Sequence, residues 1–122
     1  MWGDTLIDIE DVILQRIEQI EEDDEELETD YELIAPDNRG VITVTYDLLP
    51  IGAEFVESDV SWSREDAVDE YSFAADEGLY VAVIVPNEAF LSVKERLLRK
   101  GRIGIDVYSY ESLGILSTPM AG

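Results

Sequence analysis

The sequence Leu79-Tyr80-Val81-Ala82-Val83-Ile84-Val85 is a continuous apolar run bounded by Gly78 and Pro86. An apolar run of this length without polar alternation is typical of a strand that is covered on both faces of a sheet. We therefore predict that residues 79–85 form the buried central strand around which the rest of the chain folds.

A helix over residues 88–100 and a strand over residues 103–108 are predicted to follow this central strand. Gly101 ends the helix, because glycine readily adopts the left-handed conformation that closes a helix. The strand, helix and second strand then form a right-handed parallel crossover. The side chains expected to face inward from the helix are Phe90, Val93, Leu97 and, as a further candidate, Leu98.

The first part of the chain predicts an amphipathic helix over residues 5–27, opened by Thr5 with Asp8 as a capping pair. The apolar residues of this helix recur at spacings of three, four or seven, and they are Leu6, Ile9, Ile13, Ile17, Ile20 and Leu27. Almost all of the remaining face is acidic.

Three extended segments and a second helix are predicted between these two parts. Strands are expected at 31–35, 41–46 and 53–62, with turns at 36–40 and 50–52, a helix opened by a capping box of Ser63 and Asp66, and a short edge strand at 113–116.

The predicted fold is a single α/β domain over residues 1–122, in the order helix, three strands, helix, strand, helix, strand. It comprises the acidic helix 5–27 and a mixed sheet with two further helices over residues 31–116.

The composition excludes several kinds of chemistry. The chain has 122 residues with 29 acidic against 8 basic side chains, a net charge of -21, and neither His nor Cys. Thiolate zinc sites, thiol nucleophiles and Ser-His-Asp triads are therefore excluded. No apolar run of about 20 residues is present to span a bilayer, so a cytoplasmic protein without a membrane partner is expected.

The negative charge is unevenly distributed. Residues 1–32 hold 14 carboxylates and one base, Arg16, so more than half of the net charge lies in the first quarter of the chain. This charge disfavours diffuse binding to nucleic acid and allows a basic protein partner. The sequence leaves open whether the acidity serves binding, DNA mimicry or life in concentrated salt, where charges are screened.

A basic stretch near the other end of the chain is a candidate for contact with phosphate or with a partner. It contains Lys94, Arg96, Arg99, Lys100 and Arg102. Cations in the last turns of a helix are also stabilised by the helix dipole, which accounts for Arg99 and Lys100 without a ligand. The stretch could also meet the acidic helix of a second copy, which would make a homodimer.

Three carboxylates are candidates for a metal site. Glu57 and Asp59 fall on one face of the predicted strand 53–62, and a hairpin about residues 50–52 would bring Asp47 opposite Phe55 or Glu57. Clustered carboxylate oxygens are suited to Mg²⁺ or Mn²⁺, which can activate water for phosphoryl chemistry. The alternative interpretation is that Glu57 and Asp59 are solvent-facing charges that protect a strand from edge pairing.

The element order and these residues resemble the restriction-endonuclease-like PD-(D/E)XK nucleases. In that family an Asp near the end of the second strand and a Glu-x-Lys on the third bind the metal. Here Asp47 matches the first position and Glu57 the second, while Tyr46 replaces the usual Pro and Asp59 replaces the Lys. The resemblance implies metal-dependent phosphodiester cleavage, with Asp47, Glu57 and Asp59 as catalytic residues and Asp47 and Glu57 as metal ligands.

Two functional hypotheses follow. The first is a nuclease-fold protein whose metal-dependent cleavage is weak or lost, because the position of the lysine is altered and the overall charge repels nucleic acid. The second is a non-enzymatic acidic protein that mimics DNA or occupies the basic surface of a partner.

Overall fold

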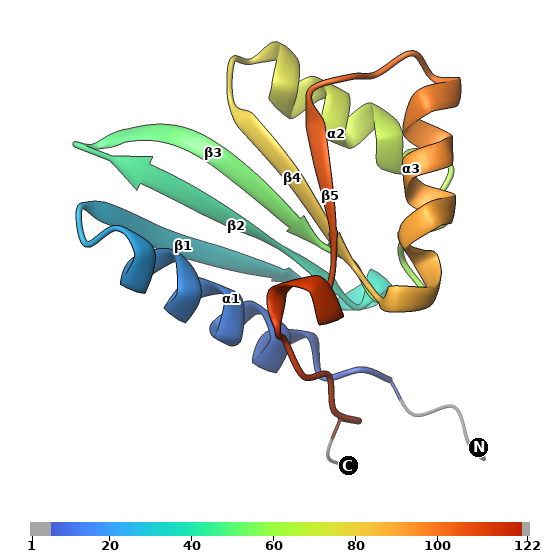
Figure 1. The fold of residues 1–122 in the computed structure, drawn as a ribbon, viewed down its shortest axis with the longest axis horizontal. Coiled ribbons are helices and arrows are strands. Elements are labelled where there is room, and N and C mark those ends of the chain that lie inside the picture. The colour runs from blue at the N-terminus through green and yellow to red at the C-terminus, as the bar shows by residue number, and fades with distance from the viewer. Residues whose placement is uncertain (1–5, 121–122) are drawn as a thin grey trace.

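The computed structural model describes residues 6–120, which form a five-stranded mixed sheet with helices on both faces (Figure 1). In chain order the elements are α1 (Ile9–Asp23), β1 (Leu27–Ile34), β2 (Arg39–Tyr46), β3 (Leu49–Val56), α2 (Ala67–Asp76), β4 (Tyr80–Val85), α3 (Phe90–Arg99) and β5 (Ile105–Ser109). Short 3-10 turns occupy Ala35–Asp37, Asn87–Ala89 and Glu111–Leu113. The predicted order of helices and strands and the α/β class are confirmed.

The strands lie in the order β1-β2-β3-β4-β5. The first three form an antiparallel meander, and β3, β4 and β5 are parallel. The change of direction falls at β3, where the two-residue hairpin gives way to helical crossovers through α2 and α3. The predicted meander and late parallel crossover are therefore both confirmed.

Each face of the sheet has its own core. On one face α1 covers the antiparallel strands, and on the other α2 and α3 cover the parallel strands (Figure 1). Residues 81–85 of β4 are all buried because successive side chains enter opposite cores. The prediction of a central strand covered on both faces is confirmed.

The first helix is shorter than predicted. Asp8 caps it by accepting a hydrogen bond from the Asp11 N–H at 3.2 Å, and the helix ends before Asp24. Its last turn contains no base, and carboxylates at a helix C-terminus are opposed by the helix dipole. Leu27 therefore belongs to β1, while the predicted cap Thr5 lies outside the described residues.

The predicted turn at residues 50–52 is wrong. The chain reverses instead at Asp47 and Leu48, so that Tyr46 pairs with Leu49 and residues 50–52 lie within β3. Pro50 is tolerated in β3 because β4 begins pairing only at Gly52, and Ile51 is the extra residue of a bulge.

Three further sequence predictions are wrong. The third strand ends at Val56, so Glu57 and Asp59 do not share the face of an extended strand. Residues 113–116 form no strand: Leu113 ends a 3-10 turn that begins at Glu111, and Gly114 follows it in the left-handed conformation. The second helix begins at Ala67 after Asp66, so Ser63 does not cap it.

None of the helices in residues 6–120 is long and apolar enough to cross a membrane.

The turn between β2 and β3 is strained. Asp47 has φ of 50° and Leu48 has φ of 68°, a conformation that glycine adopts without steric cost but that leucine disfavours. We expect Leu48→Gly to raise the free energy of unfolding by about 1 kcal/mol. Urea denaturation would measure the change, and Leu49→Gly in the adjacent strand should lower stability instead.

Candidate functional site

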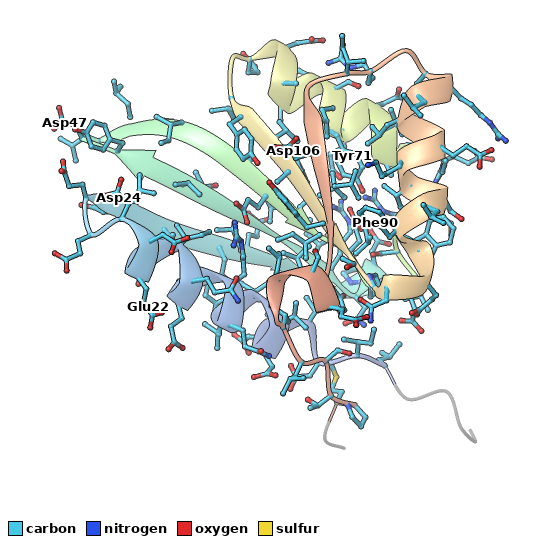
Figure 2. All side chains as sticks on the ribbon, in the orientation of Figure 1. Glu22, Asp24, Asp47, Tyr71, Phe90 and Asp106 are labelled. Atoms are coloured by element: carbon cyan, nitrogen blue, oxygen red, sulfur yellow. The ribbon has the colours of Figure 1, made fainter. Side chains whose placement is uncertain are left out.

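The structure does not bring the predicted metal ligands together. Asp47 lies in the turn before β3 and Glu57 follows the last residue of β3. At roughly 3.3 Å per residue, the eight residues of β3 that lie between Asp47 and Glu57 extend over about 26 Å. Figure 2 shows Asp47 at the end of the hairpin, far from Tyr71, whose hydroxyl binds Glu57. One cation cannot bridge them.

Asp59 does not complete a metal site with Glu57. The Asp59 side chain is exposed, whereas Glu57 is fully buried. Within residues 6–120, no group of three or more acidic side chains is arranged to hold a metal ion.

Glu57 is instead the centre of a buried hydrogen-bond network. Its carboxylate accepts hydrogen bonds from the Ser61 hydroxyl at 2.7 Å, the Tyr71 hydroxyl at 2.6 Å and the Arg64 guanidinium at 3.2 Å. The Tyr110 hydroxyl donates to the Glu57 carbonyl. Since a buried carboxylate needs several donors to remain charged, this network accounts for Glu57 without any ligand.

A second carboxylate extends the network to β2. Glu70 of α2 accepts two hydrogen bonds from Arg39, each of 2.9 Å, and one from Arg64 at 3.1 Å. Arg39 also lies 4.0 Å from Glu57, so two arginines are shared between two carboxylates. Asp37 and Asp66 also pair with Arg39 and Arg64, at 3.6 and 3.1 Å, so both arginines are engaged by carboxylates and offer no free positive charge to an anionic substrate.

Burial and the Glu57 carboxylate raise the pKa of Tyr71 well above its usual range. Burial also lowers the pKa of Arg64, but the nearby Glu57 and Glu70 carboxylates outweigh this effect and raise it. Both groups therefore stay protonated at neutral pH. Each can therefore donate the hydrogen bond that the Glu57 carboxylate accepts.

The predicted basic stretch is divided by the fold. Arg96 points inward and donates to the Trp62 and Arg64 carbonyls, each at 2.9 Å. Arg102 donates to the Ser72 carbonyl at 3.1 Å and pairs with Asp76 at 3.0 Å. These two arginines are bonded within the chain. The exposed residues of the basic stretch are Lys94, Arg99 and Lys100.

A pocket of about 280 Å³ lies between α1 and the sheet. The Arg16 guanidinium lines it and binds both carboxylate oxygens of Glu54, at 2.7 and 3.0 Å. Burial lowers the pKa of Arg16, but the hydrogen bond to Glu54 and the charge of Glu54, with smaller effects of Tyr108 and Tyr80, together outweigh burial and raise the pKa. Arg16 and Glu54 satisfy each other, so the charge that the pocket still presents to a ligand is the exposed carboxylate of Asp23 in its wall.

Sequence reasoning missed this pair, although the sequence contains a signal for it. Arg16 is the one base among residues 1–32 and lies three residues after Ile13 and four before Ile20, on the apolar face of α1. A base in that position needs a buried acidic partner, but its identity depends on the sheet.

The acidic surface is concentrated at one end of the molecule. All six carboxylates of residues 21–26, which we call the acidic turn, are exposed where α1 leads into β1. The hairpin tip, residues 46–51, lies beside it because Tyr46 pairs with Leu27. Figure 2 shows Asp24 and Asp47 at this same end.

Comparison with family models, curated proteins and solved structures finds no match to this chain.

The role assigned to Glu57 predicts unequal effects for the two neighbouring candidate carboxylates. Glu57→Ala should lower the free energy of unfolding by about 3–5 kcal/mol, because it leaves buried guanidinium and hydroxyl donors unpaired. Asp59→Ala should change it by less than about 0.5 kcal/mol, since that side chain is exposed. Urea denaturation of both variants tests this, and equal effects would contradict the assignment.

The raised pKa of Tyr71 predicts alkaline instability. A tyrosine in an unfolded chain titrates near pH 10, so the stability that protonated Tyr71 contributes is complete below about pH 10 and is lost as the pH rises further. We expect Tyr71→Phe to be less stable at neutral pH and to lose less stability above pH ~10. Unfolding free energies measured across this range test the prediction, with exposed Tyr46→Phe as the control.

Proposed function

We propose that this protein is a non-enzymatic interaction protein that binds a basic surface of another protein through the acidic turn. We further propose that it keeps a restriction-endonuclease-like arrangement of helices and strands without the cleavage chemistry of that fold. Asp47 and Glu57 are separated by the length of β3, and this separation supports a proposed function without phosphodiester cleavage.

The observation that carries the proposal is that most of the basic side chains lie in the interior, whereas the carboxylates of the acidic turn are exposed. Five of the eight bases are buried or half-buried and are bonded within the chain, namely Arg16, Arg39, Arg64, Arg96 and Arg102. The acidic turn has no base beside it in sequence, so its potential is not neutralised locally. A potential of one sign over one end of a protein attracts a partner of the opposite sign and speeds encounter.

The proposal predicts that binding depends on the position of the acidic side chains as well as on the net charge of the protein. We expect the triple variant Glu22→Lys, Glu25→Lys, Glu26→Lys to bind a labelled oligolysine peptide about tenfold more weakly than wild type, a loss of about 1.4 kcal/mol. Fluorescence anisotropy would measure the affinity. Binding by wild type should also fall as salt rises, because screening shortens the reach of the charges.

The matched control reverses three exposed glutamates elsewhere on the molecule, in the variant Glu65→Lys, Glu88→Lys, Glu111→Lys. Both variants change the net charge equally. A smaller loss in the control supports a local site at the acidic turn. Equal losses would mean that the peptide responds only to total charge, and the proposal would be wrong.

A further inference from the structure

The hairpin tip exposes apolar side chains together. Leu48 is 85% exposed and Leu49 66% exposed, and Tyr46 and Ile51 are also exposed beside them. Contiguous apolar surface of this kind is uncommon on a monomer and marks a contact with another molecule. The tip therefore has the composition of an interface core.

The backbone of the tip gives independent support. A two-residue turn with positive φ at both positions favours Asn-Gly, yet Leu48 stands at the second position with φ of 68°. Leu48 gains no burial in return, because its side chain points into solvent. Backbone strain that no contact within the chain offsets is typical of residues that serve binding or catalysis.

A complementary surface lies on the same chain, between α3 and β5. A pocket of about 210 Å³ is lined by Leu97, Leu98, Ile103, Gly104, Ile105 and Val107, with Lys94 and Arg102 also in its wall. Small-molecule sites usually measure about 300–1,000 Å³, so this smaller pocket suits a protein side chain better than a ligand. We call it the α3 pocket.

Exposure and charge both match the α3 pocket to the hairpin tip. Leu98 and Ile103 of the pocket are 67% and 87% exposed, so an entering side chain would cover apolar surface on both partners. The tip contains Asp47 and adjoins the acidic turn, whereas Lys94 lines the pocket and Lys100 is exposed at the end of α3. An apolar centre with a charged rim is the usual anatomy of a protein interface.

We infer that copies of this chain associate head to tail, with the hairpin tip of one copy seated in the α3 pocket of the next. The inference goes beyond the proposed function, because the apolar hairpin tip makes this contact, whereas the acidic turn beside it binds the basic partner. Contact between two tips is disfavoured because it would bring two acidic turns together. A contact between unlike surfaces leaves one tip and one pocket free for further copies, unless a ring closes.

The net charge of -21 sets the expected salt dependence of this association. At about 0.1 M salt the Debye length is about 10 Å and whole copies repel, but at about 1 M it is about 3 Å and the apolar contact remains. Sedimentation velocity on the full chain should therefore show monomers at low salt and association at high salt. Oligolysine binding should follow the opposite trend, so the two proposals can fail separately.

Leu48→Gly tests the tip. It should weaken the high-salt association constant about tenfold or more, the ratio expected for one leucine side chain removed from an apolar contact. Because this substitution relieves positive φ at a non-glycine residue, a loss of association cannot be attributed to unfolding. Leu48→Asn, which also tolerates this backbone conformation, should give the same loss.

Ile103→Glu tests the α3 pocket, and Leu91→Glu is its control because Leu91 is exposed on α3 outside the pocket lining. Only Ile103→Glu should weaken association. Mixing the Leu48→Gly and Ile103→Glu variants should restore one contact, between the tip of the second variant and the pocket of the first. The mixture should therefore form a one-to-one pair that grows no further.

Three outcomes would overturn the inference: a wild-type chain that stays monomeric at all salt concentrations, association unchanged by Leu48→Gly or Ile103→Glu, or a mixture that forms no pair. If oligolysine still binds at the acidic turn in any of these cases, the proposed function stands without this association. If association occurs as described but oligolysine binding does not depend on the acidic turn, the contact is apolar and the charge-based proposal is wrong.

Discussion

The rest of the structure depends on the need to satisfy one buried carboxylate, that of Glu57, at the end of β3. The side chain has no exposed surface, so the cost of removing its charge from water must be offset by donors from several elements. Ser61 and Arg64 come from the loop that follows, and Tyr71 comes from α2. These bonds hold α2 and its connecting loop against the ends of β3 and β4. The residue that most resembled a metal ligand is therefore one that fixes the position of a helix.

The arginines show how an acidic chain can fold compactly. Arg39 and Arg64 bind Glu57 and Glu70 in one internal network, and Arg16 binds Glu54 in the other core. Bases placed inside neutralise the carboxylates that the fold must bury, but they leave the surface carboxylates unopposed. The strong potential of the acidic turn is thus partly a consequence of how the interior is stabilised. This physical link joins the stability of the fold to the proposed binding of a basic surface.

At the hairpin tip, the features that suit binding lower the stability of the fold, whereas the buried arginines raise it. Residues 46–51 place apolar side chains in solvent, and Leu48 holds a backbone conformation that favours glycine. Each feature lowers the stability of the isolated chain, and both lie at one point of the molecule beside its most charged segment. A docking surface explains all three features together. High salt screens the charge and leaves the apolar contact, so the two parts of the surface act under different conditions.

The sequence by itself determined the type and order of the elements, because runs and periodicities record local burial. The run at residues 79–85 indicated the central strand, and the spacing of Ile13, Ile17 and Ile20 indicated the buried face of α1. Only the tertiary structure decided the candidate site. Whether Glu57 faces a metal or an arginine depends on distant residues such as Arg39, and the position of Asp47 depends on a turn that local propensity assigns elsewhere. Local patterns report which side chains are buried, whereas their partners are set by the packing of segments far apart in the chain.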